Sequence, residues 1–212
     1  MTSVRGGSKL LHYLLDSHPS IIAFPRTFQF DSFWRSIKNE EQSISHIAKK
    51  FILDYPRFFS GKNWSQINVL DKADKLGENQ NETFEVDKDL FKKNLVKLFP
   101  SGKEIDSKSL FINLHIAYHK TIGKDIRENF IILYHIHALS KHKTLEFCLE
   151  DFGANNVKVI FMTKHPLVGL NSVINWMDNV LIELDNQPGT LLYYQNETYI
   201  GFDKIKLKFP TL

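Results

Sequence analysis

Hydrophobic positions at helical spacing define the start of the chain. Between Ser8 and Ser17, leucines recur at positions 10, 11, 14 and 15. Apolar residues three and four positions apart share one face of an α-helix. The pattern predicts an amphipathic helix over this range, and the helix begins directly after Gly6 and Gly7.

Two further stretches with helical spacing follow in the first half of the chain. They cover Phe33 to Phe58 and Lys88 to Phe99, and a Pro-Ser-Gly stop at residues 100–102 ends the second. Between them, Ser60 to Glu85 is polar and centres on "KLGENQNET". Long polar connections lie on protein surfaces and often carry binding residues. We expect a surface excursion or a substrate-side loop there.

The second half contains two short runs with a different pattern. "NFIILYHIH" (129–137) and "VKVIFMTKHP" (157–166) concentrate β-branched and aromatic residues, as strands buried on both faces of a parallel sheet do. Between them, apolar residues from His142 to Phe152 recur at helical intervals. Strand, helix and strand in this order predict a right-handed βαβ unit. The segment "YIGFDKIKL" (199–207) is either a further strand or a closing helix.

The composition indicates one globular domain over residues 1–212. Hydrophobic residues make up 42% of the 212 residues and aromatic residues 13%, which excludes a disordered chain. The net charge of +3 comes without dense clusters of Lys and Arg, so it favours an anionic small ligand over nucleic acid. Cys148 is the single cysteine, so neither an intramolecular disulfide nor a thiolate zinc site can form.

The two ends of the sequence also carry expectations. No apolar run approaches the ~20 residues that span a bilayer, and the N-terminus lacks a signal-peptide core. We therefore expect a cytoplasmic protein with no membrane span. Only Met1 to Val4 precede the glycine turn, about half of a typical strand, and the chain stops at Leu212 soon after "GFDKIKL". We expect a fragment, a mis-assigned start or a minimal version of the domain.

The Gly-Gly turn before the first helix has the chemistry of an anion site. A glycine-rich turn that opens a helix presents several backbone N–H groups and the positive end of the helix dipole. Arg5 and Lys9 flank the turn with positive charge, and Ser8 adds a hydroxyl. A phosphate or sulfate group would be held by backbone, hydroxyl and cation together. An ordinary helix start without a ligand is the alternative interpretation.

A second candidate anion site follows the predicted strand that starts at Val157. The strand ends near Thr163, so Lys164 lies at its carboxyl end, and Ser172 follows eight residues later. Ligands of open α/β sheets bind at the carboxyl ends of the strands. Lys164 and Ser172 would bind one phosphate from two sides. The alternative is a solvated lysine and a helix-surface serine.

Together the two stretches resemble the sulfotransferases that use 3′-phosphoadenosine 5′-phosphosulfate (PAPS). "VRGGSKLLHYLLDSHPSI" (4–21) is similar to the 5′-phosphosulfate loop of that family, including the His-Pro pair at 18–19. "VKVIFMTKHPLVGLNS" (157–172) resembles its 3′-phosphate segment at Lys164, Pro166 and Ser172, with lysine in place of the usual arginine. The resemblance implies a three-layer α/β/α fold with a central parallel sheet, similar to that of P-loop NTPases.

The same resemblance implies an activity and a set of binding residues. A sulfuryl group would pass from PAPS to a hydroxyl or amine on a small-molecule, carbohydrate or lipid acceptor, and no metal is implied. The 3′-phosphate would be held by Lys164 and Ser172. The residues that would hold the 5′-phosphosulfate are Arg5, Gly6, Gly7, Ser8, Lys9 and Leu10. Arg5 and Lys9 would also stabilise charge on the transferred group.

The general base is where the chain departs from the family. Many members have a glutamate about seven residues after the His-Pro pair, and this chain has Arg26 there. An arginine cannot accept a proton at physiological pH. His135 and His137, at the exit of the 129–137 strand, are the candidates to replace it. Histidines at strand ends also serve simply to bind backbone groups, which is the alternative role for each.

Two other functions fit parts of the pattern. A degenerate relative that kept the anion loop and lost the base would bind a nucleotide or phosphate without catalysis, and Arg26 favours this alternative. A P-loop small-molecule kinase would share strand, loop and helix, but the Walker A spacing and an evident magnesium-binding motif are missing. His115 and His119 lie four residues apart with no evident third ligand, so we expect that pair to be structural.

Overall fold

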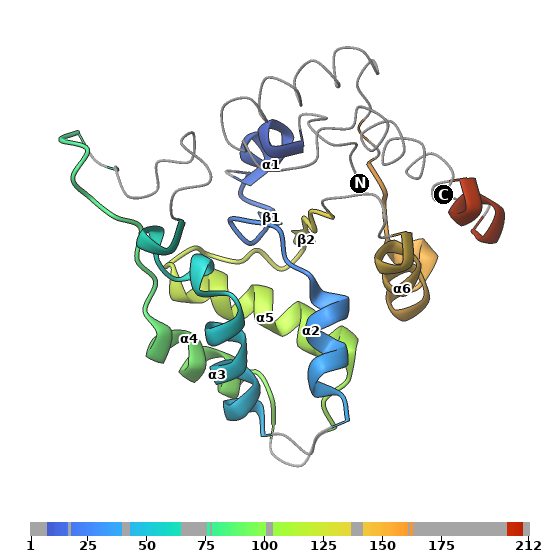
Figure 1. The fold of residues 1–212 in the computed structure, drawn as a ribbon, viewed down its shortest axis with the longest axis horizontal. Helices are drawn as coiled ribbons and strands as arrows, with labels where there is room; N and C mark the ends of the chain where they lie inside the picture. The colour runs from blue at the N-terminus through green and yellow to red at the C-terminus, as the bar shows by residue number, and fades with distance from the viewer. Residues whose placement is uncertain are drawn as a thin grey trace, which may run out of the picture. The chain divides into compact units, whose positions relative to one another are not determined.

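The chain divides into two compact units in a computed structural model. The central unit is Asp16–Tyr134, and the terminal unit combines Met1–Leu15 with His135–Leu212 (Figure 1). The structure describes residues 8–16, 18–39, 43–64, 76, 78–100, 104–136, 142–160, 162 and 203–209.

Helices dominate the described residues. The α-helices are α1 (Ser8–Asp16), α2 (Phe30–Ile37), α3 (Ile44–Asp54), α4 (Lys88–Lys97), α5 (Ser107–Thr121) and α6 (His142–Phe152), and a further short helix covers 203–208. Three short 3₁₀ helices are η1 (Pro56–Phe58), η2 (Gly61–Trp64) and η3 (Ala154–Asn156). The two strands are β1 (Ile21–Ile22) and β2 (Ile131–Ile132).

Several helices are confirmed where the sequence predicted them. α1, α4 and α6 cover the predicted ranges to within two residues, and the helix at 203–208 decides between the two alternatives for 199–207. α4 has a strong start signal, because the Asp87 carboxylate accepts hydrogen bonds from the N–H groups of Asp89 and Leu90, both at 2.9 Å.

The helical region predicted from Phe33 to Phe58 is divided into separate helices in the structure. The structure has α2 and α3 there, followed by η1. The physical reason is a new helix start at Ser43, whose hydroxyl accepts a hydrogen bond from the N–H of His46 at 3.3 Å. α3 then ends before Pro56, which opens η1.

The two strands form a short parallel sheet within the central unit. Ile21 pairs with Ile131 and Ile22 with Ile132. The N–H of Ile131 donates to the carbonyl of Ser20 at 2.8 Å, and the N–H of Leu133 donates to the carbonyl of Ile22 at 2.9 Å. Parallel pairing far apart in sequence places the chain in the mixed α/β class.

The first predicted strand is shorter in the structure than in the sequence pattern. Of the described part of the run 129–137, which ends at residue 136, only Ile131–Ile132 pairs with another strand. Of the run 157–166, residues 157–160 belong to neither helix nor strand, Met162 forms an isolated bridge, and the other residues lie outside the described ones.

Aromatic side chains fill the core of the central unit. α4 contacts both α3 and α5, and the three helices lie side by side (Figure 1). Phe24, just after β1, stacks on Phe58 with ring centroids 4.8 Å apart, and its edge meets Tyr118 of α5 at 5.1 Å. Such contacts contribute about 0.5–1.5 kcal/mol each beyond the burial of apolar area. They hold the chain that follows β1 against α5.

The described core of the terminal unit is aliphatic instead. Leu145, Cys148 and Leu149 of α6 are buried, as are Ile136 and Ile205. Lys208 forms ion pairs with Glu146 and Glu150 of α6, which hold the helix at 203–208 against it. Among the helices of the described ranges, none has both the length and the apolar character that a bilayer crossing needs.

Candidate functional site

α1 begins where the sequence places the anion site. Ser8 is its first residue, so the helix starts directly after the Arg-Gly-Gly sequence at 5–7. The first turn of a helix has N–H groups with no partner inside the helix, and these point toward whatever lies before it. Arg5, Gly6 and Gly7 lie outside the described residues, and of Ser8 and Lys9 only the backbone is described.

The faces of α1 differ from the predicted amphipathic arrangement. Leu10 and Leu14 are exposed by 65% and 66%, whereas His12 is exposed by only 6%. The buried face of α1 therefore carries an imidazole. An exposed Leu10 agrees with a role in the loop through its backbone, since its side chain is not needed for packing.

His135 lies beside this helix within the terminal unit. It follows β2 by three residues and is half-buried. Its ring and that of His12 have centroids 5.8 Å apart, with the ring planes inclined by 40°. The structure thus brings one of the two predicted bases against the helix that the anion loop opens. The other, His137, lies outside the described residues.

Only one of the remaining candidate residues lies among the residues that the structure describes. Lys164 and Ser172 lie outside the described residues. Arg26, which stands at the family's glutamate position, is half-buried in the connection between β1 and α2 of the central unit.

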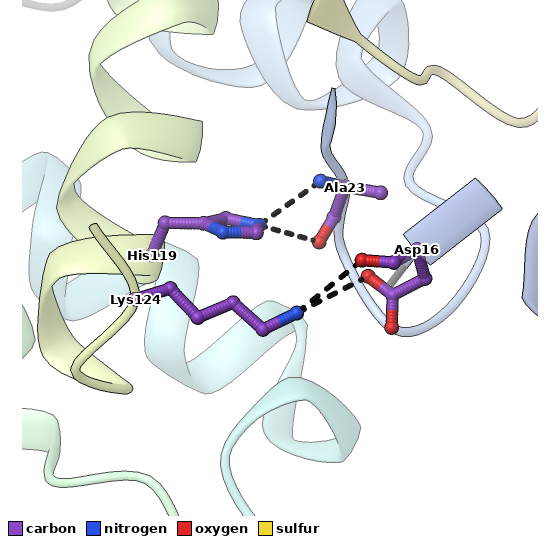
Figure 2. A network of polar contacts seen from close by, with 4 residues as sticks. All are labelled: Asp16, Ala23, His119 and Lys124. Carbon is purple, nitrogen blue, oxygen red and sulfur yellow. Dashed lines mark hydrogen bonds and ion pairs between the residues drawn. The ribbon is translucent and has the colours of Figure 1, made fainter. Parts of the chain in front are cut away.

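The position of β1 is fixed by a buried histidine of α5. The N–H of Ala23, the residue after β1, donates to Nε2 of His119 at 2.9 Å, and the Ala23 carbonyl oxygen lies 3.0 Å from the same nitrogen (Figure 2). Ser20 and Ile22 use their carbonyls to pair with β2, so by the alternation of a strand Ala23 faces the opposite edge. His119 therefore covers the second edge of β1.

A lysine just beyond α5 reaches the same stretch of chain. Nζ of Lys124 lies 3.6 Å from Oδ1 of Asp16 and 3.5 Å from its carbonyl oxygen (Figure 2). Asp16 is the last residue of α1. Lys124 thus contacts the last residue of α1, and His119 contacts the residue that follows β1.

The other histidine of α5 belongs to the aromatic core. Nδ1 of His115 donates to the carbonyl of Phe111 at 2.8 Å, one helical turn earlier, and its ring centroid lies 4.2 Å from that of Phe24. Burial disfavours the charged imidazolium and lowers the pKa of His115 to about 3. His115 is therefore neutral at physiological pH.

His119 is neutral for the same main reason. Burial lowers its pKa, and the positive charge of Lys124 acts in the same direction, while its contact with the Ala23 backbone and the charge of Asp16 oppose the shift. A neutral ring with its proton on Nδ1 can accept the Ala23 N–H at Nε2, which a protonated ring cannot. In the described part of the chain no group of three or more His, Cys, Asp or Glu side chains is arranged to hold a metal ion.

Sequence reasoning missed His12. The apolar pattern drew attention to the leucines of α1, two of which are exposed. Its position in the sequence could have indicated it. His12 lies four residues after Ser8, which is about one helical turn beyond the start of the helix.

Comparisons with known proteins identify no relative. The chain matches no protein-family model, and no curated protein or solved structure is significantly similar to it.

Proposed function

We propose that the chain is a PAPS-dependent sulfotransferase, with a three-layer α/β/α fold around a parallel sheet. The order and spacing of the two anion motifs support the proposal. So does the parallel pairing of β1 with β2, two strands separated by more than a hundred residues. The start of α1 at Ser8, with His135 beside the same helix, is the observation that carries it most directly.

The donor set of the chain suits PAPS. Arg5, Lys9 and the N–H groups at the start of α1 offer fixed positive charge for a phosphosulfate, and Lys164 with Ser172 offers a second site for the 3′-phosphate. PAPS supplies the sulfuryl group when it is bound. The cations would stabilise charge on its oxygens during transfer, and His135, as a neutral imidazole, would accept the proton of the acceptor hydroxyl or amine.

Arg26 favours one other candidate, a protein that binds the nucleotide without catalysis. This residue stands where a carboxylate base is expected, and an arginine cannot take a proton. Such a protein would bind the nucleotide in the same way and leave PAPS intact. Release of adenosine 3′,5′-bisphosphate from PAPS in the presence of a phenol such as 4-nitrophenol separates the two candidates.

The proposal predicts selective binding of adenosine 3′,5′-bisphosphate. Calorimetric titration should give tight binding of this ligand and no binding of ATP with magnesium, since the Walker A spacing of a kinase is missing. Lys164→Ala should weaken binding of the bisphosphate about 10-fold or more and leave binding of adenosine 5′-phosphate nearly unchanged. The reason is that a charged hydrogen bond to one phosphate contributes about 1.5–3 kcal/mol.

Lys158→Ala is the matched control, because Lys158 is an exposed lysine six residues earlier in the same segment. It should bind both nucleotides as the unchanged chain does. Equal losses for the two nucleotides in Lys164→Ala would remove Lys164 from the 3′-phosphate site. Binding of ATP with magnesium and not of the bisphosphate would replace the sulfotransferase by a kinase.

A further inference from the structure

We propose that His12 is a positioning residue for His135. The inference rests on the proposed sulfuryl transfer and adds a residue to it that the sequence motifs do not include. The two rings lie 5.8 Å apart between centroids, and His12 is 94% buried, on the interior face of α1. A buried ring in a helix has few accessible rotamers, so it is a rigid surface against which a second ring can be held.

The placement of His12 connects the two parts of the proposed site. α1 starts at the anion loop, and position 12 is one turn into the helix, about 6 Å along its axis from Ser8. His135 comes from a different part of the chain, three residues beyond β2. The contact with His12 thus places the candidate base against the helix whose start would hold the phosphosulfate.

The proposed reaction requires a base close to the acceptor, because the acceptor loses a proton as its bond to sulfur forms. The acceptor oxygen forms a bond to sulfur, and the bond between sulfur and the bridging oxygen breaks with its electron pair going to the 5′-phosphate. The acceptor proton moves to a nitrogen of His135 and later leaves to solvent. A nitrogen of His135 must therefore be held within hydrogen-bond reach of the acceptor, which is the placement that the contact with His12 supports.

Kinetics on His12→Ala separate positioning from binding, because alanine removes the ring against which His135 packs. With PAPS and 4-nitrophenol, kcat should fall about 10- to 100-fold, as expected for a misplaced base, while KM for PAPS and the affinity for adenosine 3′,5′-bisphosphate stay unchanged. His12→Phe keeps a ring at this position and should recover most of the lost kcat. His12→Ala combined with His135→Ala should be no slower than His135→Ala alone. His46→Phe, at an exposed histidine of α3, is the matched control and should leave all values unchanged.

Independent losses that multiply in the double variant would overturn the role of His12, and so would a His12→Ala variant with the kcat of the unchanged chain. A chain that releases no bisphosphate from PAPS while binding it would instead contradict the proposed transfer. The two failures can be told apart. Failure of the proposed transfer is seen in the unchanged chain, whereas failure of the role of His12 is seen only in the variants.

A measurement without turnover tests the histidine contact in either case. The imidazole proton signals of His135 can be compared by NMR in the full chain and in His12→Ala. Removing a ring whose centroid lies 5.8 Å from that of His135 should shift these signals. Identical His135 signals in the two proteins would overturn the inference. His46→Phe should again have no effect.

Discussion

Two pairs of histidines in this chain differ in what surrounds them. His115 and His119 lie one turn apart on α5 of the central unit, and each ring is fixed to a backbone group, Phe111 or Ala23. His12 and His135 belong to the terminal unit, come from segments far apart in sequence and face each other as rings. Backbone contacts and an aromatic environment identify the first pair as structural. Only the second lies beside a helix that follows a candidate anion loop.

The difference teaches how burial is to be interpreted for a histidine. His115 and His119 are both exposed by only 1%, and burial lowers the pKa of both. Spacing alone would make them the better metal or catalytic candidates, since positions four apart share a helix face. Their backbone contacts instead place His115 in the aromatic core and His119 at the edge of β1.

The largest effect is expected from His115→Ala. The change removes a ring packed 4.2 Å from Phe24 and 4.5 Å from Phe111, and leaves a void in a rigid aromatic core. We expect the free energy of unfolding to fall by about 2–4 kcal/mol, as for other large-to-small changes in cores. Urea denaturation followed by tryptophan fluorescence measures it.

His46→Ala is the control for this change, because His46 is an exposed histidine on α3. It should alter the free energy of unfolding by less than about 0.5 kcal/mol. If His115→Ala were no more destabilising than His46→Ala, the structural assignment of the α5 pair would be wrong. Binding of adenosine 3′,5′-bisphosphate to the folded His115→Ala variant should be unchanged, in contrast to the transfer defect expected for His12→Ala.

Stability should also depend on pH through the α5 pair. The pKa of His115 is about 3 in the folded chain and 6.5 for an unperturbed histidine, so between these values the unfolded chain binds more protons. With respect to this group, the free energy of unfolding therefore has its highest value above about pH 6.5 and falls as the pH is lowered toward 3. The slope is up to about 1.4 kcal/mol per pH unit for each such group.

Urea denaturation at a series of pH values between 7 and 4 tests this dependence. His115→Phe, which keeps a ring in the core, should show a shallower loss of stability in acid than the unchanged chain. Equal slopes in the two proteins would mean that His115 takes up its proton without unfolding the core. His119 contributes in the same direction, because its pKa is lowered as well.

The helices that the sequence predicted correctly have clear boundaries. α4 begins at a capping aspartate and ends before Pro100, and the start of α1 is marked by two glycines. α5 was not predicted, although Asp106 caps it, because buried positions lie around much of its circumference and blur the helical period. The break between α2 and α3 depends on one serine cap, which a smooth hydrophobic pattern hides.

The candidate site was only partly predictable for a related reason. Motifs identify residues such as Arg5 and His135, since charge and glycine spacing are visible in one dimension. The contact between His135 and His12 joins residues 123 positions apart, and no local pattern encodes it. His119 was recognised as structural for lack of a third ligand, whereas its real task, covering the edge of β1 at Ala23, depends on the packing of α5.

The smallest effect on the free energy of unfolding is expected from Lys124→Met. This variant tests how much the ion pair between Lys124 and Asp16 stabilises the connection between α1 and β1. Lys124 and Asp16 are both partly exposed, at 43% and 38% of their side chains, and exposed ion pairs contribute about 0–1 kcal/mol. We expect a loss below about 1 kcal/mol that shrinks further in 1 M salt, where charges are screened within about 3 Å. Lys50→Met, which removes the exposed pair of Lys50 with Asp54 on α3, is the matched control. A loss of more than about 2 kcal/mol in Lys124→Met alone would mean that Lys124, and not the His119 contact, holds this connection.

The same variant should also raise the pKa of His119 slightly. Burial is the main reason that this pKa is low, and the positive charge of Lys124 lowers it further. NMR of the His119 ring would detect the change.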